Sequence, residues 1–152
     1  MATARAAEQP APPTLLYIIK QVELAIRSHL DDMFRPVGLT APQYTALTVL
    51  ERHPNLTSAQ LARNSFVTSQ SMADMVTALE EQGLIERRRD EADRRRLVLS
   101  LTTSGRRLLR KYRPKVAALE EQMLEGLGAR QTAELRKSLL ACRSALAEEP
   151  PH

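Results

Sequence analysis

Residues 83–102 read Gly-Leu-Ile-Glu-Arg-Arg-Arg-Asp-Glu-Ala-Asp-Arg-Arg-Arg-Leu-Val-Leu-Ser-Leu-Thr, and this stretch decides the fold. Two short apolar runs, Leu84-Ile85 and Leu97–Leu101, flank a polar loop that is dense in arginine. Every other residue of the second run is leucine, and a period of two is typical of a β-strand. The loop carries too much charge to be buried. We therefore expect a two-stranded ribbon whose tip projects into solvent or onto an anionic partner.

Capping patterns predict three short helices upstream of this ribbon. Thr40 precedes Gln43 by three residues, and Thr57 precedes Gln60 by three. In such a capping box the hydroxyl accepts from an early backbone amide and the glutamine side chain reaches back to the cap. These boxes predict helices that end at about residues 52 and 64. After a turn over residues 64–67, Thr68 caps a third helix, which Gly83 terminates.

Longer helices are predicted at both ends of the chain. The stretch Leu15–Phe34 has an apolar stripe, with Phe34 and two leucines lying off it, so this helix is apolar on more than one side and needs two partners. After the ribbon, a helix runs from about Thr102 toward residue 126, and Pro114 should kink or split it. A last helix covers residues 129–147 and includes Cys142 on an apolar stretch, where we expect it to be buried.

The predicted order is four helices, two strands and two helices, which indicates a mainly α fold with a small β-wing. A helix followed by a ribbon with a cationic tip is the layout of a winged helix-turn-helix, and the partner of that fold is DNA. We assign the winged helix-turn-helix to residues 38–105, a helical dimerisation region to 14–37 and 106–147, and disordered tails to 1–13 and 148–152. Alternatively, the terminal helices only complete the core of a monomer.

Basic residues are concentrated around the ribbon. Residues 87–115 hold 12 of the 22 basic residues and three of the 18 acidic ones, a formal charge of +9, which leaves −5 for the rest of the chain. This asymmetry favours a surface that binds a polyanion. A solvated basic surface, or a loop that binds an acidic protein, would give the same count.

The sequence argues against several other classes of protein. The single cysteine permits no intrachain disulfide or thiolate zinc site and suits a reducing cytoplasm. Neither a metal-binding spacing nor a glycine-rich phosphate loop nor a serine nucleophile motif is present, so we expect no metal, no cofactor and no enzyme. No apolar run is long enough to span a membrane, and the first 13 residues lack the apolar core of a signal peptide. We expect a cytoplasmic protein.

The candidate DNA-binding residues lie at the start of the third short helix, at one earlier cap and on the ribbon. The second helix of a helix-turn-helix enters the major groove by its N-terminal residues, and arginine enters a narrow minor groove favourably. Asp93 and Arg95 could instead hold the shape of the ribbon, and the serines and threonines could serve only as caps. The candidates are Thr57, Thr68, Ser69, Gln70, Ser71, Asp74, Thr77, Arg88, Arg89, Asp93, Arg94, Arg95 and Arg96, with Arg94 expected to be inserted.

A series of short motifs occurs in order along the same region. They are Gly38-Leu39-Thr40, Gln43-Tyr44 and Leu47, then Leu61-Ala62 and Val67-Thr68, then Leu79-Glu80 and Gly83-Leu84-Ile85, and finally Asp93-Arg94-Arg95 with Leu101-Thr102 and Gly105. Together they span about residues 38–105, and this pattern resembles the MarR (multiple antibiotic resistance regulator) family of winged-helix transcription factors. Family members often carry a basic residue near Asp74 and Ala78, which this chain lacks, so we expect base readout from Gln70 and from the wing.

The resemblance implies an obligate homodimer joined by the first and last helices. It also implies a pseudo-palindromic double-stranded DNA operator, repression, and relief by a small phenolic or anionic effector. Such an effector would lie where the dimer helices meet the DNA-binding lobe, against an aromatic wall with one cation. The candidates are Arg27, His29, Tyr44, Tyr112 and Arg113. A tyrosine packed in the core or a solvated arginine is the alternative at each position.

Overall fold

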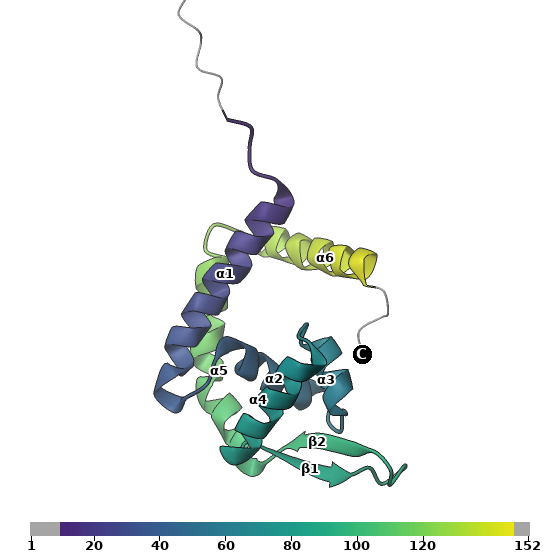
Figure 1. Cartoon of the computed structure of the whole chain (residues 1–152). Helices are drawn as coiled ribbons and strands as arrows, with labels where there is room; N and C mark the ends of the chain where they lie inside the picture. Colours follow the sequence, from purple (N-terminus) through teal and green to yellow (C-terminus); the bar gives the residue numbers. More distant parts are fainter. Residues whose placement is uncertain (1–9, 148–152) are drawn as a thin grey trace, which may run out of the picture.

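Helices account for most of the computed structural model, which describes residues 10–147 (Figure 1). In chain order the elements are α1 (Leu15–Phe34), the 3₁₀ helix η1 (Arg35–Val37), α2 (Ala41–Arg52), α3 (Ser58–Asn64), α4 (Ser69–Glu81), β1 (Ile85–Arg89), β2 (Leu97–Leu101), α5 (Thr103–Met123) and α6 (Ala129–Leu146). This order confirms the predicted mainly α fold with a small β-wing. Of the predicted tails, residues 10–13 are exposed and form no helix or strand, and the rest lies outside the described residues.

Threonine hydroxyls begin five of the helices. Both predicted capping boxes are present, because Thr40 accepts from the Gln43 amide and Thr57 from the Gln60 amide while each glutamine side chain accepts from the backbone of the cap. Thr68 caps α4, as predicted. The hydroxyls of Thr14 and Thr102 cap α1 and α5 in the same way. Each cap satisfies a backbone donor that the first turn of a helix leaves free.

The core lies where α1, α2, α4 and α5 meet, and Phe34 is its most enclosed aromatic side chain. Phe34 is fully buried, and its ring lies 4.5 Å from the ring of Tyr44 and 4.6 Å from that of Tyr112. Its place off the main apolar stripe of α1 marked it as a second face, and that second face is the one the chain buries against itself. Leucines and small apolar residues of α2, α3 and α4 complete the core.

The wing is an antiparallel pair in which Ile85 lies opposite Leu101 and Arg89 lies opposite Leu97. Leu56 adds an isolated bridge to β2, since the Leu99 amide donates to the Leu56 carbonyl at 2.8 Å. The strand predicted from alternation is confirmed, but its burial does not alternate. Four of the five β2 residues are buried and only Leu97 is exposed, so β2 is covered on both faces and is the inner strand of the ribbon.

Helix α5 runs unbroken from Thr103 to Met123 with Pro114 inside it. The prediction that Pro114 splits this helix is wrong. A proline removes one N–H donor from the ladder of backbone bonds, and in a helix of 21 residues the bonds on either side remain. The start of α5 is held tightly, because a Cβ built on Gly105 would lie 2.2 Å from the carbonyl oxygen of Leu84.

The outer faces of α1 and α6 carry the exposed apolar side chains of the molecule. In α1 the exposed ones include Leu15, Leu16 and Ile19, whose exposed fractions are 76%, 72% and 47%. Helix α6 buries no residue at all and projects from the rest of the chain (Figure 1). Cys142 is therefore exposed, and the expectation that it is buried is wrong for the single chain. None of the helices described is long and apolar enough to cross a membrane.

Candidate nucleic-acid interface

The first turn of α4 presents a row of small polar side chains to solvent. Thr68 accepts from the Ser71 amide at 3.1 Å and its hydroxyl donates to the Ser71 Oγ at 3.0 Å, so these two side chains shape the helix start. Ser69 and Gln70 are exposed beside them. The free backbone amides of a helix start favour a phosphate, and the exposed side chains can reach base edges.

Further along the same face, the polar side chains are partly occupied by each other. The Gln70 Nε2 donates to Asp74 Oδ1 at 3.4 Å, and the Thr77 hydroxyl donates to the Ala73 carbonyl at 3.1 Å. Asp74 therefore faces solvent beside Gln70 and holds its amide nitrogen. Its negative charge disfavours a nearby phosphate, which leaves the first turn as the part of α4 suited to anionic DNA.

Four arginines around the ribbon have partners within the chain. Arg88 donates to Asn55 Oδ1 at 2.9 Å, Arg89 to the Arg94 carbonyl at 3.1 Å, and Arg96 to Gln60 Oε1 at 3.3 Å. Arg87, which the sequence analysis did not single out, forms an ion pair with Glu80 at 2.6 Å. These bonds attach the wing to α3, α4 and the loop before α3. They also show Gln60 holding both Thr57 and Arg96, so Thr57 acts in the structure as a half-buried cap.

The turn between the strands is shaped by two aspartates. Asp93 Oδ1 accepts from the Arg95 amide at 3.1 Å, and Asp90 Oδ1 accepts from the Ala92 amide at 3.1 Å. Aspartate side chains stabilise tight turns by binding backbone amides two residues on. The alternative that Asp93 holds the shape of the ribbon is therefore the observed one.

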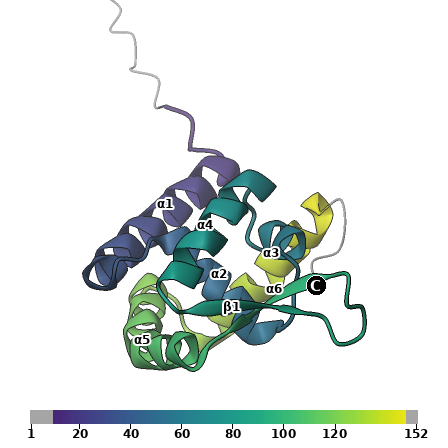
Figure 2. The ribbon, with the colours of Figure 1, turned by 60° about the horizontal axis from the view of Figure 1, so that its bottom comes forward.

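Arg94 and Arg95 are the two arginines at the tip whose side chains bond to no other described residue, and both are exposed. The ribbon that carries them extends away from the helices in both views (Figures 1 and 2). Among the described residues, the wing thus has four arginines with partners at its base and sides and two without at its tip. The unpaired cations are available to an external anion.

Asn55 is a residue of this region that the sequence analysis missed. It has a left-handed backbone conformation with φ of 68°, its amide donates to the Leu99 carbonyl at 3.2 Å, and its side chain accepts from Arg88. Asparagine tolerates positive φ better than most residues. Its place after His53-Pro54, between two helices, is a turn signal that could have identified it.

A cavity of about 420 Å³ lies between α1, α2 and α5, on the side of the helices away from the ribbon. Its walls are apolar and include Leu30 and Leu109, while Tyr44, Glu51 and Arg113 supply polar groups. Arg113 donates to both carboxylate oxygens of Glu51, at 2.9 and 3.0 Å. Burial and the nearby Glu51 carboxylate raise the pKa of Tyr44 above 10.0, although Arg113 opposes this, so the phenol stays neutral at pH 7. We name this space the α2–α5 cavity.

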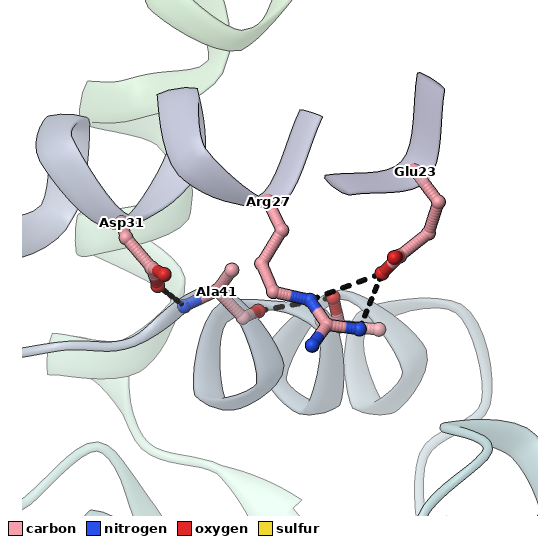
Figure 3. Close-up of polar contacts among 5 residues, drawn as sticks. Glu23, Arg27, Asp31 and Ala41 are labelled. Atoms are coloured by element: carbon pink, nitrogen blue, oxygen red, sulfur yellow. Dashed lines mark hydrogen bonds and ion pairs between the residues drawn. The ribbon is translucent and has the colours of Figure 1, made fainter. Parts of the chain in front are cut away.

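The five residues predicted for an effector pocket do not come together. Tyr44 and Arg113 line the α2–α5 cavity, but Tyr112 is buried in the core against Phe34. Arg27 faces α2 and pairs with Glu23 (Figure 3), and His29 is exposed and lines none of the cavities. The periodicity of a helix places residues on a face, but it does not tell which of two neighbouring helices that face meets. In the range 10–147 no group of three metal-binding side chains occurs.

Comparison with known proteins follows the same division of the chain. The model of the MarR family matches residues 37–96. The chain is 32% identical over 123 residues to the HTH-type transcriptional repressor Rv2887 of Mycobacterium tuberculosis, which covers 81% of this chain and 88% of that protein.

Solved structures give the same result. The structure of Rv2887 in complex with p-aminosalicylic acid has a TM-score of 0.69 at 31% identity and covers 86% of this chain and 98% of that one. The repressor CouR bound to a 23-mer DNA duplex has a TM-score of 0.71 at 30% identity, over 86% of this chain and 92% of that one. A MarR family regulator of Silicibacter pomeroyi has a TM-score of 0.82 over 87% and 89% of the two chains; at 20% identity it supports the fold alone.

Proposed function

This chain belongs to the MarR family, and from that premise we propose that it is a sequence-specific, homodimeric transcriptional repressor that binds a pseudo-palindromic operator and responds to a small anionic effector. The observation that carries the proposal is the pairing of two exposed elements. These are the polar first turn of α4 and the wing tip with Arg94 and Arg95 free of other partners among the described residues. Support comes also from the relatives, which include a repressor and a repressor bound to DNA.

In the proposed complex the first turn of α4 enters the major groove. Its backbone amides bind phosphate, and Ser69 and Gln70 contact base edges. Arg94 enters the adjacent minor groove, where the potential is most negative. Arg88 and Arg96 keep the ribbon in place through Asn55 and Gln60, so they position the wing.

We propose that the exposed apolar faces of α1 and α6 are covered by a second copy of the chain. An unpaired helix that buries nothing has no source of stability in its own chain, and two copies would bury both sets of side chains. A dimer would also present two copies of α4 about 34 Å apart, one turn of duplex DNA. On this account residues 14–37 and 106–147 form the dimerisation region and 38–105 the DNA-binding domain.

The α2–α5 cavity suits a small aromatic acid. The neutral Tyr44 phenol can donate a hydrogen bond to a carboxylate, and Arg113 supplies a cation that Glu51 holds in place until an anion competes for it. The p-aminosalicylic acid complex of Rv2887 supports this class of ligand. We propose no catalytic role for the chain, and we place it in the cytoplasm, where operator DNA is.

A mobility-shift titration tests the proposal. The labelled probe is the promoter of the gene that encodes the chain, and the competitors are the unlabelled promoter and a scrambled duplex of equal length and composition. We expect a complex that the promoter displaces and the scrambled duplex does not. Equal displacement by both duplexes, or no complex at low salt, would contradict sequence-specific binding and would favour a basic surface for some other acidic partner.

A further inference from the structure

A second cavity, of about 450 Å³, lies between α1, α2 and the turn that joins α3 to α4. It shares Ile26 and Leu30 with the α2–α5 cavity as a common wall, but its other lining residues are different. Ala41, Pro42 and Val67 make its walls largely apolar. Its volume is in the range of sites that hold small organic molecules. We name it the turn cavity.

The rim of the turn cavity is charged and its geometry is fixed (Figure 3). Arg27 and Glu23 form an ion pair on α1, with side chains that are 51% and 52% exposed. Asp31, one turn further along, accepts from the Ala41 amide at 2.6 Å and so holds the start of α2 against α1. An exposed ion pair contributes little to stability, so an anion can exchange with Glu23 for Arg27 at small cost.

Two residues of the turn are in arrangements that are unfavourable for the chain alone. Ser65 is 8% exposed and its buried hydroxyl has no hydrogen-bond partner. Phe66 is 79% exposed and has a left-handed backbone conformation with φ of 57°. A buried hydroxyl without a partner, an exposed aromatic ring and positive φ in a large residue each destabilise a fold. Such features cluster where a chain is adapted to binding.

We propose that the turn cavity is a second effector site, which binds a small aromatic carboxylate. The ring lies against Pro42 and Val67 with Phe66 closing over it. The carboxylate binds Arg27 in exchange for Glu23, and Ser65 donates its free hydroxyl to the ligand. This arrangement removes both unfavourable features at once, because the ligand supplies a partner for the hydroxyl and an apolar surface for the ring.

The position of this site gives it a direct route to DNA binding. Phe66 and Val67 immediately precede Thr68, which caps the helix that we propose to enter the major groove. A ligand that draws Phe66 inward moves the cap, and so changes the angle of the first turn of α4. The inference rests on the proposed function for this consequence alone, since ligand binding itself can be measured without DNA.

Benzoate is the probe, and calorimetric titration of the full chain measures its binding. We expect two classes of site per chain. Ser65→Ala and Phe66→Gly should each weaken one class at least tenfold while the variants melt at the same or a higher temperature, because each change removes an unfavourable feature. Arg113→Ala should weaken the other class. Ser100→Ala is the matched control, since Ser100 is the other buried serine whose hydroxyl lacks a partner but lines neither cavity.

Several results would overturn the inference. These are no benzoate binding up to about 10 mM, a single class of site abolished by Arg113→Ala, or binding unchanged in Ser65→Ala and Phe66→Gly. If Phe66→Gly instead weakens self-association in sedimentation, Phe66 packs on a partner subunit and the site is not one for a ligand. Benzoate should lower promoter affinity less in Ser65→Ala than in the wild type. Failure of the wild type to bind promoter DNA would contradict the proposed function while leaving the calorimetric result to judge the site.

Discussion

Arginines of identical chemistry have two different surroundings in the wing. Arg87, Arg88, Arg89 and Arg96 bond to side chains or carbonyls of the same chain, whereas Arg94 does not. A side chain that is bonded within the fold can be removed only with some loss of stability or of wing position. A side chain with no partner contributes little to the fold, so its removal reports on the external partner.

We predict that Arg94→Ala weakens binding to the promoter duplex by roughly 1–3 kcal/mol, because one minor-groove cation is lost. The melting temperature of the free protein should not change, since the side chain bonds to nothing else in the described residues. Mobility-shift titration and thermal unfolding measure the two effects. Unchanged promoter affinity would remove Arg94 from the proposed interface.

Asn55 separates backbone strain from side-chain bonding. Its φ of 68° suits glycine, and its Oδ1 holds Arg88. We predict that Asn55→Ala lowers the free energy of unfolding by about 1–2 kcal/mol more than Asn55→Gly, because a Cβ disfavours left-handed backbone. Urea unfolding of both variants tests this, and equal stabilities would contradict the assigned backbone conformation.

Tyr44 gives a prediction for alkaline pH. Burial raises the pKa of its phenol in the folded state above 10.0. Below pH 10 the phenol is protonated in both states and stability is unaffected. Between pH 10 and the raised pKa the unfolded chain ionises first, so the free energy of unfolding falls. The wild type should therefore lose stability more steeply above pH 10 than Tyr44→Phe in denaturant titrations, and parallel losses would show that the phenol is not shifted.

Among the elements, the caps and turns of the helix-turn-helix could be predicted from sequence, because Thr40, Thr57 and Thr68 act through residues three positions away. The wing was predictable because its arginines and alternating leucines leave few other structures. The interior of α5 was not, since a local rule about Pro114 says nothing of how many other backbone bonds the helix keeps. The effector residues failed for a similar reason, because the packing of α1 against α2, rather than against α5, decides where Arg27 points.

The junction of β1 and α5 offers a test of how tightly the elements meet. A Cβ on Gly105 would lie 2.2 Å from the Leu84 carbonyl oxygen, and backbone cannot yield as a side chain does. We predict that Gly105→Ala lowers the free energy of unfolding by about 1–3 kcal/mol. Gly126→Ala is the control, because a Cβ there meets nothing within 4 Å. Equal effects of the two changes in urea unfolding would contradict the close contact.

At the scale of the whole molecule, the chain shields one side of α1 through Leu30 and Phe34 and leaves the other side and all of α6 uncovered. The sequence indicated two apolar faces on α1, but it could not tell which one belongs to the chain's own core. The structure assigns Phe34 to that core. The remaining apolar surface is what the proposed dimer buries, and the dimer is what converts one lobe into a reader of a two-fold operator.

Sedimentation equilibrium of the chain with its own promoter duplex tests this account most directly. We predict a complex that contains the duplex and twice the 17.0 kDa of one chain, formed without a one-chain intermediate. Leu140→Glu, which places a charge on the exposed apolar face of α6, should abolish both the dimer and the complex. A stable complex of one chain with one duplex, unaffected by Leu140→Glu, would contradict it.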